Sequence, residues 1–207
     1  EEQDEVLMEY MDMVHNRKKD KDKKKRSKTE EEEIRKKYNE RVFPKNFIGP
    51  SSYTLQLENI TPSASTNGIV SVREPYTVTE KADGLRKMLY ISHEGKIYLI
   101  DMNMNVQFTG AIVREKTLFN TLMDGEHITT NRLGQFINLY AAFDIYFVNN
   151  LDMRKKALVN VEEDAEENNY RLPILKNVIK AMNHVSIVDK SLSPIRIEAK
   201  KFYVSKT

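Results

Sequence analysis

The sequence predicts an α+β fold in which short antiparallel strands dominate and helices are few. Short apolar runs recur between residues 76 and 204, and turns that contain glycine separate several of them. Residues 173–182 instead place apolar side chains at helical spacing. The first 42 residues are dense in charge and cannot bury much apolar area. Together these observations predict one sheet-rich core behind a charged helical segment.

The elements follow in chain order. Residues 5–14 have helical apolar spacing, and Thr29 with Glu32 forms a capping-box pattern for a second helix at 29–38. A further helix is expected at 173–182, with a proline at its start. Strands are expected at 76–80, at 88–90 and 97–100 around a hairpin turn at 93–96, at 106–108 and 111–113 around Gly110, at 139–147, at 195–199 and at 202–204.

Composition limits the function classes. The 207 residues, of which 40% are hydrophobic, suffice for one real core plus an appendage. A formal net charge of +2 means that any nucleic-acid contact must come from local patches. The absence of cysteine excludes disulfides and thiolate metal sites. We find no signal peptide and no apolar run of about 18 residues, so the sequence supports neither secretion nor a membrane span.

Charge segregates near the N-terminus. Residues 17–28 carry nine basic residues and two aspartates, and residues 30–33 are all glutamate. We expect residues 1–42 to be a charged helical or mobile linker, with an RNA-tethering arm as the alternative, and residues 43–207 to form the domain.

Other polar candidates are interpreted as structural. The acidic stretch 162–167 is expected to be a surface loop or helix start, because a solvated acidic run lacks the converging geometry of a metal cage. The four histidines show no metal-ligand spacing, and His127 is expected to be a strand residue and not a catalytic base.

Lys81-Ala82-Asp83-Gly84-Leu85-Arg86 is the most informative stretch. A lysine has a reference pKa of about 10.4, so a nucleophilic amine needs a site that lowers this value. Burial would do so, and Arg86 is a permanent cation that would add to the effect. Asp83-Gly84 is typical of a tight turn, and a plain β-hairpin between residues 76–78 and 87–92 is the alternative.

Two further patterns follow this stretch in order. Residues 121–126 run from an apolar strand into Asp124-Gly125-Glu126. Residues 139–147 form a strongly apolar strand that contains Phe143-Asp144. A carboxylate at Asp144 would be costly to bury without partners. It either orients Lys81 or Arg86, as Asp83 also could, or serves as a structural hydrogen-bond acceptor.

In order and spacing these patterns resemble motifs I, III and IIIa of the covalent nucleotidyltransferases, the superfamily of mRNA capping guanylyltransferases and ATP-dependent polynucleotide ligases. Residues 47–55, FIGPSSYTL, resemble a FPGxQPVSL segment of capping enzymes. The chain is most similar to the guanylyltransferase module of capping enzymes from nucleocytoplasmic large DNA viruses. The resemblance implies a nucleotidyltransferase domain of the ATP-grasp-like adenylation or guanylylation type. An ATP-dependent DNA or RNA ligase that forms lysyl-AMP is the alternative.

The resemblance also implies a two-step reaction with a role for each site residue. The reaction forms a lysyl-GMP intermediate from GTP and passes GMP to the 5′-diphosphate end of RNA. The implied roles are those of the nucleophile (Lys81), the ribose contact (Arg86), the carboxylate near the ribose and a metal-bound water (Glu126), the aromatic ring that stacks on the base (Phe143), and the two residues beside the base edge (Thr79 and Glu80). This hypothesis requires the Lys81 amine to lie near Glu126 and Phe143 and not in bulk solvent.

Cofactors and partners follow from the same resemblance. A divalent cation, Mg²⁺ or Mn²⁺, would offset the charge of the triphosphate. Triphosphatase and methyltransferase modules in the same polypeptide, and a location in the viral factory of the host cytoplasm or in the virion, are further expectations.

The C-terminal part departs from the family pattern. No glycine follows Gly134, so a motif IV with its Asp-Gly is not present, and Lys200-Lys201 are expected to be an exposed charge pair and not motif V. The chain also begins with Glu1. We therefore expect a domain truncated before motifs IV and V, which leaves a non-catalytic fragment as a third hypothesis.

Overall fold

The computed structural model describes residues 2–15, 47–61, 71–73, 76–160, 169–188 and 194–204. The expected helix at 29–38 and the acidic stretch at 162–167 lie outside these ranges.

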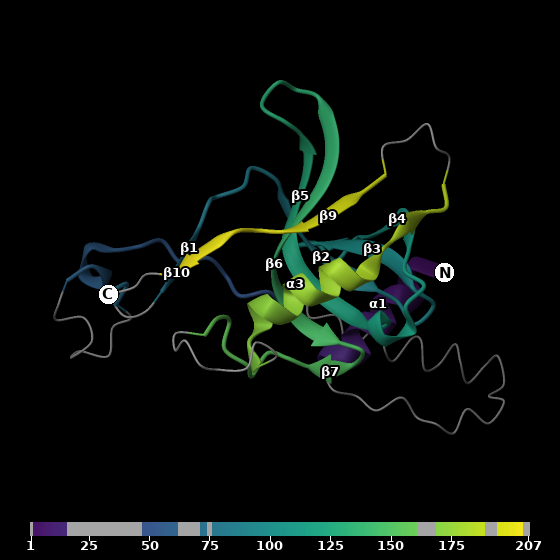
Figure 1. Cartoon of the computed structure of the whole chain (residues 1–207), viewed down its shortest axis with the longest axis horizontal. Coiled ribbons are helices and arrows are strands. Elements are labelled where there is room, and N and C mark those ends of the chain that lie inside the picture. Colours follow the sequence, from purple (N-terminus) through teal and green to yellow (C-terminus); the bar gives the residue numbers. More distant parts are fainter. Residues whose placement is uncertain are drawn as a thin grey trace.

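An eight-stranded sheet forms the centre of the molecule (Figure 1). Its strands run in the order β7-β6-β5-β2-β3-β4-β8, and β9 pairs with β6. Neighbouring strands are antiparallel, as expected, except β9, which runs parallel to β6. The strands are β2 (Leu85–Ile91), β3 (Lys96–Asp101), β4 (Val106–Ile112), β5 (Thr121–Thr130), β6 (Phe136–Val148), β7 (Leu151–Asp152), β8 (Val185–Ser186) and β9 (Arg196–Ala199).

A small two-stranded sheet lies beside the large one. Strand β1 (Thr77–Thr79) pairs with β10 (Phe202–Val204), whereas β2 pairs with β3 and β5. The turn at Asp83-Gly84 therefore joins two different sheets, and its interpretation as a plain hairpin is wrong. Only two residues separate β9 from β10, so this C-terminal segment links the two sheets.

Helices cover both faces of the large sheet. Helix α3 (Arg171–Met182) lies on the near side in Figure 1 and α1 (Glu2–Val14) lies behind. Side chains alternate between the two faces along β2, so each face has its own hydrophobic core. Leu89 and Ile91 belong to the core cluster that includes α3, whereas Met88 and Tyr90 belong to the core cluster that includes α1. Two short 3-10 helices complete the described elements, η1 (Leu57–Asn59) and η3 (Lys116–Leu118).

Helix α1 is an integral part of this core. Six of its residues are buried: Val6, Leu7, Tyr10, Met11, Met13 and Val14. The helix expected from the apolar spacing of residues 5–14 is therefore confirmed, although its apolar stripe packs on the sheet and is not solvated. Residues 16–42 lie outside the described ranges, and for them the expectation of a charged helical or mobile linker stays a prediction.

Two expected elements differ in their bounds. The helix expected at 173–182 is α3, which begins two residues earlier and places Pro173 within its first turn. The strands expected on either side of Gly110 are one strand, β4, with a shift in its register against β3. Gly110 has a φ of +79°, which lets the chain bulge without leaving the sheet.

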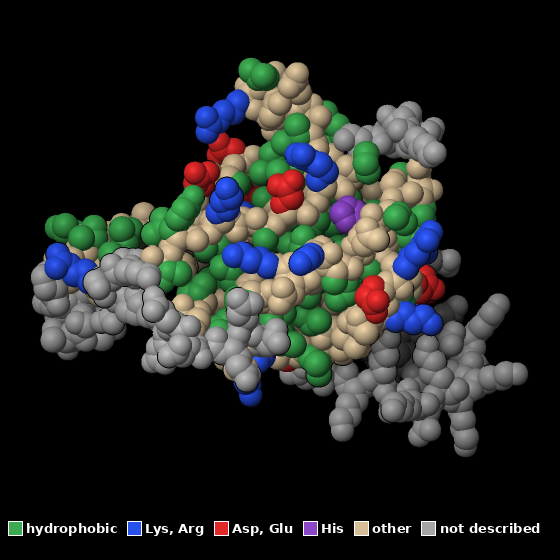
Figure 2. All heavy atoms as spheres, viewed as in Figure 1, with side chains coloured by type: hydrophobic (Ala, Val, Ile, Leu, Met, Phe, Trp, Pro, Cys, Tyr) green, Lys and Arg blue, Asp and Glu red, His purple; other side chains and the backbone are tan. Residues whose placement is uncertain are grey.

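The surface that carries α3 is mixed in character. Figure 2 shows lysine and arginine side chains over α3 and β9, with acidic side chains among them. Lys176, Lys180 and Arg196 are exposed there, and Arg196 lies 4.0 Å from Glu198. Among the described residues, no helix is both long enough and apolar enough to cross a membrane.

Replacement of Leu175 tests the packing of α3. Leu175 is fully buried, so Leu175→Ala should lower the free energy of unfolding by about 2–5 kcal/mol through lost burial and the cavity left behind. Urea unfolding would measure this loss. Lys176→Ala, at the exposed neighbouring position, should change the free energy by less than about 0.5 kcal/mol. Equal effects of the two variants would contradict the packing described here.

Candidate functional site

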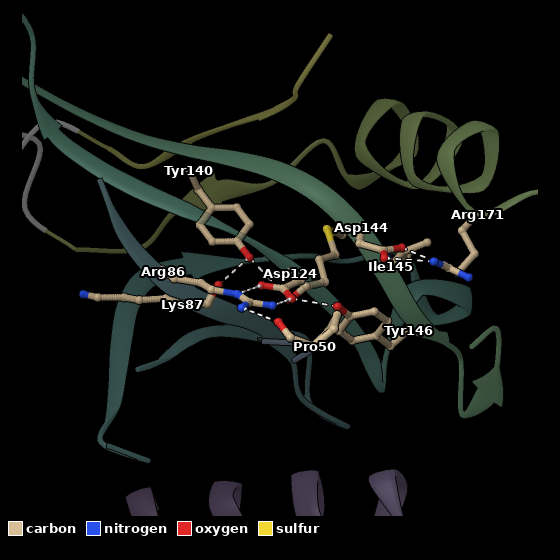
Figure 3. Close-up of polar contacts among 10 residues, drawn as sticks. Pro50, Arg86, Lys87, Asp124, Tyr140, Asp144, Ile145, Tyr146 and Arg171 are labelled. Atoms are coloured by element: carbon tan, nitrogen blue, oxygen red, sulfur yellow. Dashed lines mark hydrogen bonds and ion pairs between the residues drawn. The ribbon is translucent and has the colours of Figure 1, made fainter. Parts of the chain in front are cut away.

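Arg86 and Asp124 form the centre of the site (Figure 3). The Nε atom of Arg86 donates to Oδ1 of Asp124 at 3.1 Å, and Nη2 donates to Oδ2 at 2.6 Å. Tyr146 donates its hydroxyl proton to the same Oδ2 at 2.7 Å. Asp124 is completely buried, and its hydrogen bonds raise the pKa of Arg86 although burial opposes the rise. A bidentate pair of this kind, in which two N–H groups bond the two carboxylate oxygens, fixes the plane of the guanidinium.

The segment before the site holds Arg86 from the other side. Its Nη1 donates to the carbonyl oxygen of Pro50 at 2.7 Å, and its guanidinium lies 5.0 Å from the centre of the Phe47 ring. Gly49 packs so closely that a Cβ atom there would collide with the guanidinium and lie 2.9 Å from Oδ2 of Asp124. Residues 47–50 therefore act as a strap over Arg86, which gives a physical role to the first part of the FIGPSSYTL segment.

Two cations lie near the ring of Phe143. Its ring centre is 5.6 Å from the guanidinium carbon of Arg86 and 5.9 Å from Nζ of Lys200. The backbone N–H of Lys200 donates to the carbonyl of Ala142 at 2.7 Å, which holds the C-terminal segment against β6. The expectation that Lys200 belongs to an exposed charge pair is thus wrong, because it is half-buried beside the aromatic ring.

Lys81 is exposed in this structure. Its side chain is 87% exposed, and its Nζ lies 3.3 Å from Oδ1 of Asp83, which is 98% exposed. Such a surface pair contributes little to stability, and the orienting role expected of Asp83 stays a prediction. The expectation that the Lys81 amine is buried beside Arg86 and lies out of bulk solvent is wrong, because its side chain is exposed and, among the described residues, no polar contact joins it to Glu126.

The remaining expected residues lie on strands around this centre. Glu126 is directly opposite Arg86 in the β2–β5 ladder, and its Oε2 atom is buried without a hydrogen-bond partner among the described residues. Thr79 donates its hydroxyl proton to the carbonyl of Lys201 at 2.7 Å, so β10 holds it. Glu80 is exposed between β1 and Lys81.

Asp144 has a different partner from those expected. Its carboxylate forms an ion pair with Arg171 of α3, with distances of 2.8 Å to Nε and 3.1 Å to Nη2. Arg171 also bonds the carbonyl of Lys156. Of the two roles left open for Asp144, these contacts favour the structural acceptor, because they tie the start of α3 to β6.

His127 has a polar partner at each ring nitrogen. Nζ of Lys87 lies 3.3 Å from Nδ1, and Oδ1 of Asn138 lies 2.8 Å from Nε2. A neutral ring with its proton on Nε2 fits both contacts. Burial lowers the pKa of His127, and the cation of Lys87 lowers it further, while the bond to Asn138 opposes this. The interpretation of His127 as a strand residue is confirmed, since it lies within β5.

Several site residues were not predicted. Asp124 was noted only as part of a motif, and Tyr146 lies within the strand expected at 139–147, yet Asp124 holds Arg86 and Tyr146 holds Asp124. An aspartate in an apolar strand needs a partner, and this signal alone could have linked Asp124 to a nearby arginine. Among the described residues, no three acidic or histidine side chains gather as a metal cage. A cation would therefore depend on Glu126 and on oxygens of a bound ligand.

Replacement of Gly49 tests the strap. Gly49→Ala should lower the free energy of unfolding by about 1–3 kcal/mol, because the added methyl group must displace the Arg86 guanidinium or the Phe47 ring. Chemical unfolding would measure the loss, with Ser51→Ala as the control at an exposed position on the same segment. An unchanged midpoint for Gly49→Ala would show that the strap does not pack as described.

His127 should make stability depend on pH. Its folded pKa lies below the ordinary value, so the unfolded chain binds more protons in the interval between the two. The stability it contributes is present above about pH 6.5 and is lost as the pH falls through the folded value. His127→Gln should flatten the fall in the unfolding free energy measured from pH 7 to 5. An identical slope in both proteins would contradict this assignment.

Comparison with known proteins identifies the family of the chain. The family described as the mRNA capping enzyme catalytic domain matches residues 18–207. A probable mRNA-capping enzyme of Acanthamoeba polyphaga mimivirus is 34% identical over 122 residues, which is 56% of this chain and 9% of the relative. The chain thus spans a small part of the length of that relative. Because the family match covers most of the sequence, the chain belongs to the family of mRNA capping enzyme catalytic domains.

Proposed function

We propose that this domain is an mRNA guanylyltransferase whose nucleophile is Lys81. In the first step the Nζ lone pair attacks the α-phosphorus of GTP, a P–N bond forms, the bond to the bridging oxygen breaks and pyrophosphate leaves. In the second step a terminal oxygen of a 5′-diphosphate RNA attacks the same phosphorus. The P–N bond then breaks and Lys81 regains its amine. Family membership and the order of the three motifs support this proposal.

The observation that carries the proposal is the half-buried ring of Phe143, whose centre lies 5.6 Å from the guanidinium carbon of Arg86. An aromatic face offers about 1–3 kcal/mol of stacking to a nucleobase. Nζ of Lys200 lies over the ring, 5.9 Å from its centre, so a base that stacks on that face would displace the ammonium. Family membership supports GTP as the nucleotide.

Arg86 is prepared to bind the ribose. Its hydrogen bonds to Asp124 and Pro50 use three of the five N–H donors of a guanidinium. The two remaining donors are available to a sugar hydroxyl. Thr79 and Glu80 remain candidates for contact with the edge of the base, because they directly precede Lys81. Asp83 would orient the Lys81 amine.

A divalent cation fits the chemistry of Glu126. Its buried Oε2 has no partner among the described residues, and a carboxylate of this kind can hold Mg²⁺ or Mn²⁺ through a water molecule. When bound, such an ion would offset the charge of the triphosphate.

The exposed amine of Lys81 must lose water before it can react. We assign this desolvation to nucleotide binding, because a base on Phe143 with its ribose toward Arg86 would place the phosphates near the turn that carries Lys81. Asp83 would release the amine at the same stage, which is a small cost for a surface pair.

The wider setting remains part of the proposal. The much greater length of the viral relative supports a place for this domain beside triphosphatase and methyltransferase modules in one polypeptide. Action in the viral factory of the host cytoplasm or in the virion is consistent with this setting.

Covalent labelling tests the function. The chain, and a version extended through motif V, would be incubated with magnesium and α-labelled GTP or ATP, then denatured. Label from GTP alone is expected, with none in Lys81→Ala and about 5–150-fold less in Phe143→Ala through lost stacking. Lys180→Ala, an exposed lysine on α3, should label normally.

Other outcomes would overturn parts of the proposal. Label from ATP alone would indicate a ligase. Label that survives Lys81→Ala, or its absence from both chains, would reject the nucleophile. Label in the extended chain only would show that residues 1–207 are a non-catalytic fragment.

A further inference from the structure

The hairpin of β5 and β6 extends beyond the strands on either side of it. Its last ladder pair with β2 is at His127, and its last pair with β9 is at Leu139. Residues 129–138, here called the hairpin tip, therefore pair with no other strand among the described residues. In Figure 1 the hairpin rises clear of the helices at the top of the molecule. The reaction proposed above does not use this tip.

The turn of the hairpin tip has a fixed shape. The backbone N–H of Gly134 donates to the carbonyl of Asn131 at 2.9 Å, and Gly134 has a φ of +75°. The side-chain oxygen of Asn131 accepts from the backbone N–H groups of Leu133 at 2.9 Å and Gln135 at 3.0 Å. A turn held in this way loses little conformational freedom when it binds a partner.

The side chains on the hairpin tip have the chemistry of a nucleic-acid contact. The side chains of Leu133 and Phe136 are 81% and 59% exposed, and Arg132 is exposed beside them. From residue 127 to residue 143 the sequence has no aspartate or glutamate, and Arg132 is its one lysine or arginine. An exposed aromatic ring near a cation, with no acidic side chain on the same hairpin, is suited to stacking on a base and binding a phosphate.

The base of the hairpin touches the turn that follows Lys81. A Cβ atom on Gly84 would lie 2.8 Å from the carbonyl oxygen of His127 and 2.9 Å from Cγ1 of Ile128, so the two segments are packed together. Phe136 is paired with Thr130, two residues beyond Ile128. Two strand residues span about 7 Å, which places Phe136 close to the turn that presents the nucleophile.

Phe136 also lies on the correct face of the sheet. Side chains at alternate positions of a strand share one face, so Glu126 and Thr130 are on the same side of β5. Residues that are paired across a ladder share a face as well, and Arg86 is paired with Glu126 while Phe136 is paired with Thr130. The exposed ring therefore continues the face that carries the candidate nucleotide site.

We propose that the hairpin tip binds the 5′ end of the acceptor RNA. The ring of Phe136 stacks on a base within the first two nucleotides, and Arg132 contacts a phosphate that follows. This inference assumes the proposed function, in which the 5′-diphosphate end must reach the phosphorus held at Lys81. The RNA is single-stranded at this end, because a base that stacks on a side chain has to leave its neighbours.

Binding of a 5′-diphosphate single-stranded RNA, measured by fluorescence anisotropy, tests the stacking contact. Phe136→Ala should raise the Kd by about 5–150-fold, whereas Phe136→Tyr should bind nearly as well as the wild type. Leu151→Ala, which removes an exposed apolar side chain from β7, is the control and should leave the Kd unchanged. Equal binding by Phe136→Ala and the wild type, or no binding by the wild type, would overturn the inference and indicate a protein contact at the tip.

The salt dependence of the same measurement tests Arg132. Arg132→Gln should reduce the slope of log Kd against log salt concentration by about 0.7, as expected for one phosphate contact in a single strand. Arg114→Gln, at an exposed arginine that follows β4, should keep the slope of the wild type. A slope unchanged by Arg132→Gln would remove the phosphate contact from the inference.

An RNA whose first two nucleotides lack their bases locates the stacked base. The wild type should bind this RNA more weakly than the complete RNA, and Phe136→Ala should then cause no further loss, because the ring has lost its partner. An equal loss from Phe136→Ala with both RNAs would place the contact elsewhere and overturn the inference.

Covalent labelling separates this inference from the proposed function. The first step needs no RNA, so Phe136→Ala should form the labelled adduct from GTP at the rate of the wild type. Transfer of GMP to the RNA should instead show a raised KM for RNA. A slower first step in Phe136→Ala would contradict an RNA-specific role. If the wild-type protein forms no adduct, the proposed function fails, and the anisotropy measurements still decide whether the hairpin tip binds RNA.

Discussion

Two buried aspartates that face each other across neighbouring strands set the main constraint on this structure. Asp124 of β5 and Asp144 of β6 are directly paired in the ladder, and like charges at such positions repel. Each carboxylate has its own arginine: Arg86 from β2 and Arg171 from α3. The two ion pairs therefore fix how the strand after Lys81, the Asp-Gly-Glu strand, the Phe-Asp strand and α3 lie together. The three sequence motifs are neighbours in space because β2, β5 and β6 are adjacent in the sheet, and each aspartate there has its own arginine.

Local patterns in the sequence predicted the elements well and their partners poorly. Apolar alternation identified the hairpin of β2 and β3, the long strand β6 and helix α3, because these elements bury a face that the spacing records. The pairing of β1 with β10 has no local signature, since hydrogen bonds of the backbone are the same for any partner. The apolar spacing of residues 5–14 predicted helix α1 but not its packing on the sheet, because the many charges of residues 17–42 placed the helix in a segment interpreted as a linker.

The order of the motifs selected Lys81, Arg86, Glu126 and Phe143 as site residues, and their roles stay predictions. The partners of Arg86 come from three separate segments, which spacing along the chain cannot bring together. Lys200 was set aside because its neighbours do not form the expected motif, although its place beside Phe143 depends on the pairing of β9 with β6. Lys81 is exposed because it lies in the connection between two sheets, and the hydrophobic periodicity of strands does not predict how residues in such a connection are placed.

The short segment from β9 to β10 has a consequence for how the protein is made. Thr79, two residues before Lys81, bonds Lys201, 122 positions later in the chain. A ribosome releases residues in order, so the strand that presents Lys81 emerges long before its partner does. Contacts between such distant residues also form slowly. The large sheet and its arginine pairs can assemble first, and the segment that presents Lys81 is held by its partner only after residues 201–204 have been synthesised.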